Sequence, residues 1–392
     1  PAITIRYAHE RPEGMDEGTL IVCGLKSGEV LDAVKVVCEQ FAEYGPMRQV
    51  ADYLAPAVSR KIVRLVMSYT GYVNRTVWRK SRAGDVGVSA SGDSVLVTGS
   101  SGFVGKALCE ELCKRNTLVA PVSRAWLAPE SIADSLRQCS TLVHLAARVH
   151  VMHDTAQDPL NEYRRTNVQG TLNLALHAAA AGVRRFVFIS SVKVNGESTA
   201  AGLSFRPDDV PAPQDPYGIS KMEAEQCLRL IAKETGMEVV IIRPPLVYGP
   251  GVKANFESMM RWLARGVPLP LAAVTQNRRS LVALDNLVDL IVTCLHHPAA
   301  ANQEFLVSDG EDLSTADLLT RMGAALGHPA RLFYIPPSVL KLGAKVVNKP
   351  GIYQRLCVSM QLDIAKTRHL LGWTPPVSVK EGLRRAAEGF RA

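Results

Sequence analysis

From Ser94 onward, short apolar segments alternate with longer segments in which apolar residues recur at helical spacing. The short segments have the length and β-branched content of strands, and they read SVLVT, TLVAPVS, TLVHLAA, FVFIS and VVIIRP. Helical stretches lie between them, including one that starts at Phe103 and one that ends at Ala181. Strands that are apolar on both faces and alternate with helices pair in parallel and are covered on both sides. The sequence therefore predicts an α/β fold built on a doubly wound parallel sheet.

A glycine-rich loop, TGSSGFVGKAL, follows the first of these strands, with Gly99, Gly102 and Gly105 in the spacing G-x-x-G-x-x-G. Glycines at these positions let the chain turn tightly, let backbone N–H groups approach a pyrophosphate and let the next helix pack close to the strand. A nucleoside triphosphate loop would need a glycine at position 100 and Ser or Thr at position 107, where the sequence has Ser100 and Ala107. The loop therefore favours a Rossmann-like dinucleotide site.

The choice between NAD and NADP depends on the end of the second strand. In NAD-binding sheets an acidic residue about twenty positions after the loop usually binds the ribose hydroxyls. No Asp or Glu occurs between Glu111 and Glu130, and the second strand ends in Ser123-Arg124. An arginine there can pair with the extra phosphate of NADP, although it can equally be a solvated loop residue. We therefore expect NADP(H), with NAD(H) as the alternative.

The segment DPYGISKMEAEQ is predicted to begin a helix, because Asp215 suits the N-cap and Pro216 suits the first helical position. The four-residue spacing puts the phenol of Tyr217 and the ammonium of Lys221 on one helix face. Such a pair is often only a surface or half-buried contact. In a dehydrogenase Tyr217 would be the proton donor and Lys221 would lower its pKa, since a phenol with a pKa near ~10 is otherwise a weak base.

With these features and a serine at the end of FVFISS, the sequence resembles the extended short-chain dehydrogenase/reductase family over roughly residues 94–392. That family acts on nucleotide-activated sugars. The motifs that carry the resemblance occur in the family's order: the three glycines, HLAA (144–147), Asn167 in NVQGT, Ser191, Tyr217-x-x-x-Lys221, RPPLVYGPG (243–251), Arg279 before LVALDN, and LGWTPP (371–376).

The resemblance implies roles for individual residues. Ser191, Tyr217 and Lys221 are implied to be catalytic: Ser191 binds the substrate oxygen, Tyr217 is the acid/base, and Lys221 also holds the nicotinamide ribose. The implied cofactor-binding residues are Gly99, Ser101, Gly102, Phe103, Val104, Gly105, Arg124, Leu145, Ala146, Ala147, Asn167, Tyr217, Lys221 and Pro244. The implied substrate-binding residues are Ser191, Lys193, Asn255 and Arg279, and no metal ligand is implied.

Positions just after the catalytic serine distinguish the reactions of the family. Dehydratases carry an Asp-Glu pair there, because eliminating water needs an acid and a base, whereas this sequence has Val192 and Lys193. The resemblance therefore implies reduction or epimerisation at C4 of the sugar. AARVHVMHD, SSVKVNGE and RPPLVYGPGVKANF are most similar to the branch that reduces UDP-4-keto-6-deoxy-N-acetylhexosamines for bacterial surface polysaccharides (O-antigen or capsule).

Two alternatives stay open: a UDP-sugar 4-epimerase with tightly held NAD, and a catalytically silent nucleotide-binding scaffold. Leu246 stands in RPPLVYGP where epimerases commonly carry an asparagine that meets the substrate. Only 17 residues separate Arg124 from Leu142, where the family usually has a further strand whose acid contacts adenine. The shortened region at 125–141 therefore decides whether the chain can still form an adenine pocket.

The first part of the chain has a different character. RYAHERPEGMDEGTL (6–20) and VNRTVWRKS, the end of a helix expected from Arg60, resemble the C-terminal end of the non-hydrolysing UDP-N-acetylhexosamine 2-epimerases. In that two-lobed α/β fold Glu10 and Arg11 would lie near the UDP. The N-terminal lobe and the catalytic acids of that family are missing, so we expect no 2-epimerase activity from this fragment.

Composition predicts the division of the chain. The 2-epimerase fragment is placed at 1–82 and a linker at 83–93, where AGDVGVSASGD is small and flexible in composition. A dinucleotide-binding domain is predicted at 94–250, and the looser, proline-rich pattern at 251–392 predicts a smaller substrate-binding lobe. The chain starts at Pro1 in a strand-like segment, so we expect it to be cut from something longer.

Charge and cysteine content limit the partners and the location. The chain of 392 residues has a formal charge of +8, of which +3 falls in residues 1–82 and the rest is spread without a basic run. This favours anionic small molecules over nucleic acid. The eight cysteines lack metal-site spacing, and we find no signal peptide and no apolar run near the ~18 residues of a membrane span, so we expect a cytoplasmic protein. The resemblance also implies a possible homodimer through the helix at 157–181 and the Tyr217 helix.

Overall fold

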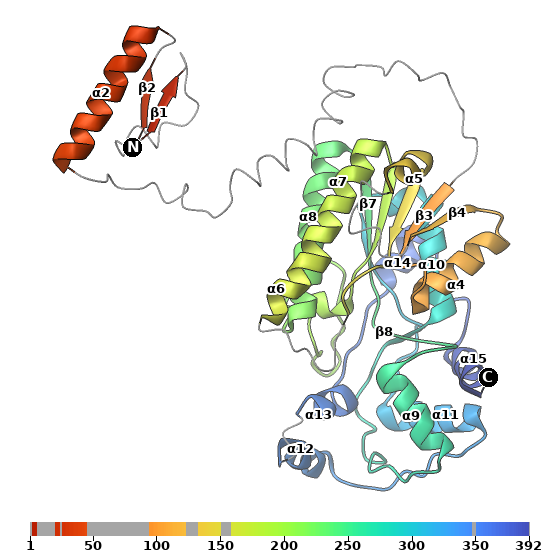
Figure 1. The fold of residues 1–392 in the computed structure, drawn as a ribbon. Helices are drawn as coiled ribbons and strands as arrows, with labels where there is room; N and C mark the ends of the chain where they lie inside the picture. The colour runs from red at the N-terminus through yellow and green to blue at the C-terminus, as the bar shows by residue number, and fades with distance from the viewer. Residues whose placement is uncertain are drawn as a thin grey trace. The chain divides into compact units, whose positions relative to one another are not determined.

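The structure is a computed structural model that describes residues 2–5, 20–23, 26–44, 94–122, 132–149, 158–346 and 350–391. The chain divides into two compact units, Pro1–Thr70 and Gly71–Ala392, which we describe separately (Figure 1). In the first unit, the parallel strands β1 (Ala2–Ile5) and β2 (Leu20–Cys23) are followed by α2 (Ser27–Tyr44). The helix expected from Arg60, the pair Glu10 and Arg11, and the linker at 83–93 lie outside the described residues.

A six-stranded sheet forms the centre of the second unit, in the order β10-β7-β6-β5-β3-β4. All of its strand pairs are parallel. Its strands are β3 (Ser94–Thr98), β4 (Leu118–Val122), β5 (Thr141–His144), β6 (Arg185–Ile189), β7 (Glu238–Arg243) and β10 (Glu304–Leu306). The chain leaves β3 for β4 on one side and then returns to β5 on the other side of β3. This arrangement confirms the predicted doubly wound sheet, and it creates a topological switch point between β3 and β5.

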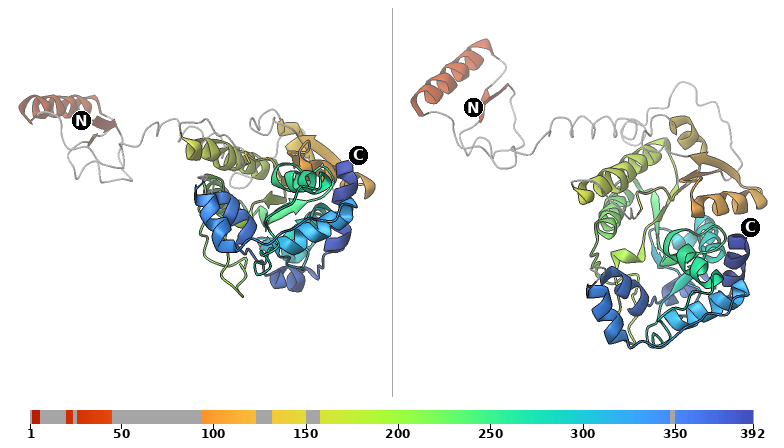
Figure 2. Two further views of the ribbon diagram at one scale, coloured as in Figure 1. Left: turned by 90° about the horizontal axis from the view of Figure 1, so that it is seen from below. Right: turned by 60° about the horizontal axis from the view of Figure 1, so that its bottom comes forward.

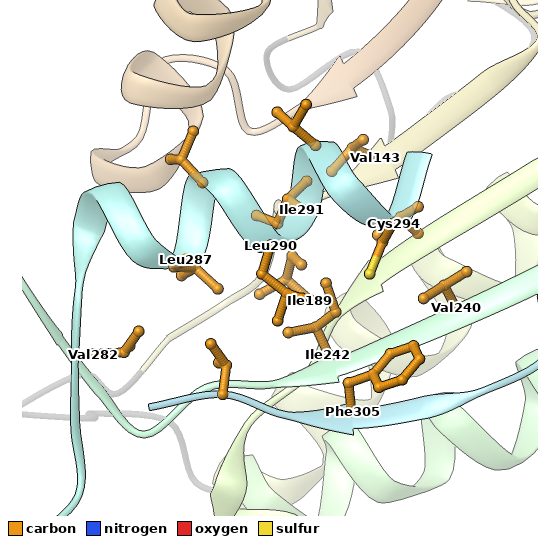
Figure 3. Packing of buried hydrophobic residues seen from close by; sticks show 14 of the residues in the cluster. Val143, Ile189, Val240, Ile242, Val282, Leu287, Leu290, Ile291, Cys294 and Phe305 are labelled. Atoms are coloured by element: carbon orange, nitrogen blue, oxygen red, sulfur yellow. The ribbon is translucent and has the colours of Figure 1, made fainter. Parts of the chain in front are cut away.

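Helices cover both faces of this sheet. On one face lie α4 (Phe103–Lys114) and α10 (Leu284–His296), and on the other lie α5 (Ala133–Gln138), α7 (Thr171–Ala181) and α8 (Pro216–Thr235) (Figure 1). Leu287, Leu290 and Ile291 of α10 pack on the strand residues Ile189 and Ile242 (Figure 3). Apart from the edge strand β4, whose Leu118 is 71% exposed, the strands are buried on both faces, which is why their sequences are apolar almost throughout.

The helix expected to end at Ala181 is interrupted. It begins as α6 (Pro159–Tyr163), continues as a π-helical segment, η4 (Arg164–Gly170), and becomes α7. Asp158 caps its start by accepting a hydrogen bond from the Asn161 N–H at 3.1 Å. Segments of π-helix are rare and frequently mark functional positions.

A second lobe extends from the carboxyl side of the sheet. Its elements are β8 (Leu246–Tyr248), β9 (Leu281–Ala283), α9 (Ala254–Ala264), α11 (Thr315–Leu326), α12 (Pro337–Val346), α13 (Pro350–Cys357) and α15 (Val379–Arg391). The helix α14 (Ala365–Leu371) instead lies against the large sheet, where the Thr367 hydroxyl donates to the Leu306 carbonyl of β10 at 2.7 Å. The strands β8 and β9 pair in parallel. The lobe predicted at 251–392 is not one continuous stretch, because α10 and β10 return to the large sheet. Within the described ranges, no helix combines the length and apolar character that crossing a bilayer requires.

The shortened region before β5 is only partly described. Among the described residues β4 is an edge strand of the sheet, and residues 132–140 hold the short helix α5 rather than a strand. Arg124, on which the NADP expectation rests, lies outside the described residues. The cofactor preference therefore stays a prediction.

The contact between α10 and the sheet can be tested by truncating a buried side chain. Leu290 has no exposed surface, so Leu290→Ala leaves a cavity and should lower the free energy of unfolding by about 2–5 kcal/mol. The matched control is Leu203→Ala, since Leu203 is 64% exposed and its loss should cost little. Urea unfolding measures both variants, and equal effects of the two substitutions would contradict the packing described here.

Candidate active site

The glycine loop joins β3 to α4 in a tight turn. Gly99 has a φ of 72°, its N–H donates to the Val122 carbonyl at 3.0 Å, and its own carbonyl accepts from the Gly102 N–H at 2.9 Å. A Cβ at Gly105 would lie 2.1 Å from the Gly99 carbonyl oxygen, so only glycine lets α4 start this close to the loop. The first N–H groups of α4, from Phe103 on, have no intrahelical acceptor, and with the helix dipole they suit a phosphate.

The loop after β5 meets the glycine loop at the switch point. A Cβ at Gly99 would lie 2.8 Å from the Ala146 nitrogen, and the Leu145 N–H donates to the Thr98 carbonyl at 3.2 Å. The structure thus brings together the two loops that carry most of the predicted cofactor residues. Several of them keep accessible surface: Ser101, Gly102, Phe103, Val104, Leu145, Ala146 and Ala147.

Asn167 lies in the π-helical segment and is 1% exposed. Its Oδ1 accepts from the Arg148 N–H at 2.8 Å, and its Nδ2 donates to the Arg148 carbonyl and to the Ser220 hydroxyl, both at 3.0 Å. Both amide hydrogens are therefore used within the protein. Asn167 joins the loop after β5 to helix α8, which is a positioning arrangement for a residue predicted to bind the cofactor.

Helix α8 begins as predicted. The Asp215 carboxylate accepts from the Gly218 N–H at 2.7 Å, and Pro216 occupies the first helical position. A Cβ at Gly218 would lie 3.0 Å from the Lys193 carbonyl oxygen. The first turn of α8, which carries Tyr217, therefore lies against the turn that follows Ser191.

The serine turn is held from the other side by β7. Ser191 caps the short 3-10 helix η5 (Val192–Val194), with its hydroxyl oxygen accepting from the Lys193 N–H at 3.3 Å. The Val192 N–H donates to the carbonyl of Pro244 at 3.0 Å. Pro244, predicted to contact the cofactor, is buried just after β7 and supports this turn.

Lys221 lies one turn after Tyr217 and is 2% exposed. Its Nζ donates to the Ile189 carbonyl at 2.8 Å and lies 4.4 Å from the centroid of the Phe188 ring. The distance from Nζ to the centroid of the Tyr217 ring is 6.0 Å. Burial lowers the pKa of Lys221 to about 7, and the negative charge of Glu225 opposes this shift. The predicted catalytic residues Ser191, Tyr217 and Lys221 are thus brought together.

The pKa of the Tyr217 phenol does not follow the expectation that Lys221 lowers it. The side chain keeps some accessible surface, yet burial raises the pKa of its phenol, and Asp215 and Tyr163 add to the rise. The Tyr163 ring packs edge-on against it with centroids 6.1 Å apart. Burial also lowers the pKa of Lys221, so the two buried groups both favour their neutral forms. The protein alone therefore keeps Tyr217 protonated.

Lys193, predicted to bind substrate, has two carboxylate partners. Its Nζ forms a short contact with Asp215 and lies 3.0 Å from Glu197. Burial lowers the pKa of Lys193, but these carboxylates outweigh it and leave the pKa raised. Lys193 therefore stays charged and ties the serine turn to the N-cap of α8.

The other predicted substrate residues belong to the lobe. The Nη1 atom of Arg279 donates to the Val358 carbonyl at 2.9 Å, burial lowers its pKa, and Glu197 opposes that shift. Arg279 is thus a half-buried cation within electrostatic range of the carboxylate that pairs with Lys193. Asn255 is exposed at the start of α9, and the described contacts do not bring it into this group.

Sequence reasoning missed a buried ion pair directly beneath the site. Arg243, 1% exposed, donates from Nε to Oε1 of Glu225 at 2.8 Å and from Nη2 to its Oε2 at 2.6 Å. The Ser190 hydroxyl donates to the same carboxylate at 2.6 Å. Glu225 stands four residues after Lys221, a spacing visible in the sequence, but its partner at the end of β7 is visible only in the fold.

His144, the first residue of HLAA, was also passed over. It is fully buried between the hydroxyls of Thr98 and Thr171, with Nδ1 and Nε2 at 2.6 Å and 3.0 Å from them. Burial lowers its pKa well below the usual value, and the positive charge of Lys221 adds to this. The ring stacks on Phe188, with centroids 5.9 Å apart. A neutral His144 is therefore buried between the residues that precede the cofactor loops and the Phe188 ring beside Lys221.

A cavity of about 1130 Å³ lies elsewhere in the second unit. It is lined by the loop at 198–209, by residues at 308–312 and by α14, and none of the predicted site residues lines it. The candidate site is marked instead by the converging side chains of Ser191, Tyr217 and Lys221.

Comparison with known proteins decides the family. The NAD dependent epimerase/dehydratase family matches residues 95–308, which run from β3 to just past β10. The chain belongs to this family. The match confirms the predicted family over residues 95–308, and the family binds a nicotinamide cofactor. It includes both loops of the switch point, Ser191 and the Tyr217-x-x-x-Lys221 pair.

Relatives within this family catalyse more than one reaction. The chain is 47% identical to a UDP-glucose 4-epimerase from Vibrio cholerae over 312 residues, which is 76% of this chain and 95% of that protein. It is 26% identical to a GDP-6-deoxy-D-mannose reductase from Pseudomonas aeruginosa over 307 residues, 74% of this chain and 94% of the other. A structure of RMD from Pseudomonas aeruginosa complexed with NADPH matches with a TM-score of 0.62 and 25% identity, over 76% of this chain and 99% of that one.

The glycine loop gives the first prediction for the site. Gly105→Ala places a methyl group against the Gly99 carbonyl, which should push α4 from the loop and weaken NADPH binding at least about tenfold. Gly28→Ala is the control, because a Cβ at Gly28 meets nothing within 4 Å. Fluorescence titration with NADPH measures both proteins, and unchanged affinity in Gly105→Ala would contradict the proposed cradle.

The buried lysine gives a pH-dependent prediction. The pKa of Lys221 is about 7 in the folded chain and near ~10.4 when unfolded, so between these values the unfolded chain binds more protons and stability rises with pH. Lys221→Met lacks this contribution. From about pH 7.5 to about pH 9 the stability of the wild type should therefore rise by about 2 kcal/mol relative to Lys221→Met. Urea unfolding at both pH values provides the measurement, and a constant difference between the two proteins would rule out the lowered pKa.

Proposed function

We propose that this chain is an NADP(H)-dependent 4-ketoreductase acting on a UDP-linked 4-keto-6-deoxy-N-acetylhexosamine, a precursor of bacterial surface polysaccharides. The observation that carries the proposal is the position of Tyr217 between the serine turn and the buried Lys221, where burial raises the pKa of its phenol. A carbonyl that receives hydride needs a proton donor beside its oxygen, and a phenol with a raised pKa is such a donor.

The residues of the switch point fit a dinucleotide. The glycine loop and the first N–H groups of α4 would hold the pyrophosphate, and the loop at Leu145–Ala147 would line the nicotinamide half. Lys221 would hold the nicotinamide ribose. The cradle at Gly99 and Gly105 supports this fit, because neither position has room for a side chain.

The reaction needs one hydride and one proton. When bound, the reduced nicotinamide supplies the hydride to C4 of the sugar. Tyr217 donates its phenolic proton to the C4 oxygen, so that the ketone becomes an alcohol, and the ammonium of Lys221 stabilises the phenolate left behind. Ser191 donates a hydrogen bond to the same oxygen and orients it. A proton from solvent then restores the phenol.

Two further features favour reduction. Val192 and Lys193 stand where a dehydratase would carry its acid and base, and Lys193 is paired with carboxylates. Leu246 is 41% exposed and offers no polar group of the kind epimerases use at that position.

A UDP-sugar 4-epimerase is the second candidate. The observation in its favour is the 47% identity to the UDP-glucose 4-epimerase from Vibrio cholerae over most of the second unit. Such an enzyme would retain NAD through purification and return it unchanged after each cycle. For residues 1–82 we propose only a remnant of a 2-epimerase without activity.

The reaction can be assigned with two substrates. The purified chain with NADPH should consume one NADPH for each UDP-4-keto-6-deoxy-N-acetylhexosamine reduced, followed by absorbance. With UDP-glucose and NAD it should yield no UDP-galactose. Formation of UDP-galactose would support the epimerase instead, and inactivity in both assays would leave a nucleotide-binding scaffold.

Tyr217→Phe separates chemistry from binding. Removal of the phenolic proton should lower kcat by at least about 10²-fold, while NADPH affinity stays within about twofold of the wild type. The fluorescence titration provides the matched control for folding and cofactor binding. Turnover that survives the substitution would eliminate Tyr217 as the proton donor.

A further inference from the structure

Two stretches of the second unit contain no acidic residue. Residues 258–284 hold four Lys/Arg and residues 318–362 hold six, with no Asp or Glu in either. These stretches together carry +10, whereas the whole chain carries +8, so the remainder is −2. Neither stretch contains a basic run, and the concentration of charge appears only when acids are counted as well as bases.

The fold joins these two stretches at the end of the lobe. The Leu269 N–H donates to the Arg331 carbonyl at 2.9 Å, and the Phe333 N–H donates to the Leu269 carbonyl at 3.0 Å. The helices α9, α11, α12 and α13 lie together at this end, beyond the carboxyl side of the large sheet (Figures 1 and 2). We call the surface formed by residues 261–272 and 331–345 the basic tip.

Large apolar side chains are exposed on the basic tip. Tyr334 is 72% exposed, Leu342 63% and Val339 53%. Trp262, Val267 and Phe333 are also exposed, and the backbone pairing above places Val267 and Phe333 in neighbouring segments. A cluster of this kind on a folded lobe indicates an interaction surface.

The helix α12 carries both exposed apolar side chains and exposed lysines, on adjacent faces. Leu340 packs against the core of the lobe, whereas Val339 and Leu342, three residues apart, point away from it. Lys341 and Lys345, four residues apart, form an exposed basic edge beside them. An exposed apolar face next to lysines is typical of helices that lie in a membrane interface.

Four of the five cations of the basic tip are available to an external partner, whereas Arg261 pairs with Glu257. Arg265, Arg331, Lys341 and Lys345 are exposed, and within the part of the chain that the structure describes none of them forms an ion pair. Elsewhere in the second unit most arginines on helices pair with a carboxylate, as Arg384 does with Glu381. The tip therefore presents uncompensated positive charge.

We propose that the basic tip docks the protein on an anionic membrane surface. Phospholipid head groups supply the negative charge that the tip lacks, and aromatic and aliphatic side chains enter the boundary between head groups and acyl chains. Nucleic acid fits less well, because its phosphates would meet Val339, Leu342 and Tyr334. A second copy of the chain would bring an equally basic surface against the first.

Docking would place the lobe, and the site above it, at the bilayer surface without a membrane-spanning segment. The inference does not depend on the reaction proposed above, because it rests on charge and exposure at the far end of the lobe.

Vesicle sedimentation of the full chain tests the proposal. The protein should sediment with vesicles of phosphatidylcholine and phosphatidylglycerol at low salt, should bind pure phosphatidylcholine weakly, and should be released by high salt. Lys341→Glu with Lys345→Glu should weaken binding to the anionic vesicles at least about tenfold. Val339→Ser with Leu342→Ser should weaken it several-fold. Circular dichroism verifies that each variant is folded, which these exposed positions permit.

Two matched variants lie outside the basic tip. Lys233→Glu changes an exposed lysine near the end of α8, and Leu203→Ser changes an apolar side chain that is 64% exposed. Both should bind vesicles like the wild type. No binding to anionic vesicles, or equal losses in tip and control variants, would overturn the proposal. Sedimentation velocity that shows a dimer broken by the tip variants, without vesicle binding, would assign the surface to a second copy instead.

Discussion

A buried pair of opposite charges, Arg243 and Glu225, connects nearly every part of the site. Arg243 ends β7, Glu225 lies on α8, and each is almost inaccessible to water. The same guanidinium donates to Asn195 and to the Pro207 carbonyl in the loop after the serine turn. The Ser190 hydroxyl donates a further hydrogen bond to the Glu225 carboxylate. Removing one partner would leave an uncompensated charge in the interior, which is far more costly than the pair itself. Strand, helix and loop must therefore be assembled together.

The helix α8 extends this pair in both directions. Tyr217, Lys221, Glu225 and Arg229 recur at every fourth position and form a row along one face. At one end of the row stands the phenol, and at the other Arg229 pairs with Glu304 at the start of β10. Glu225 lies between them and acts on both neighbours, since its charge opposes the fall in the Lys221 pKa. The pKa of Lys221 thus depends on Glu225, which is connected through Arg229 to Glu304 on the edge strand β10.

The parts of this molecule that were predictable from sequence are those set by local chemistry. Apolar β-branched runs indicated β3, β5, β6 and β7, and the Asp215-Pro216 cap indicated the start of α8 to the residue. The parallel sheet followed from the alternation of apolar and helical segments, and the family followed from motif order. Electrostatic state could not be derived in this way: the high pKa of Tyr217 and the pairing of Lys193 depend on which residues the fold brings near them. The π-helical turn at Asn167 likewise has no local sequence signal, because its hydrogen bonds join segments that meet only in the fold.

The return of α10 and β10 to the large sheet has a consequence for recombining this protein with its relatives. A crossover at position 250 would separate α10 from the strands that it covers, including Ile189 and Ile242 beneath it (Figure 3). A working chimera would have to replace the lobe segments separately and keep α10, β10 and α14 from the parent that supplies the sheet. The lobe is thus exchangeable only as a set of insertions, and recombination with a single breakpoint would not transfer it intact.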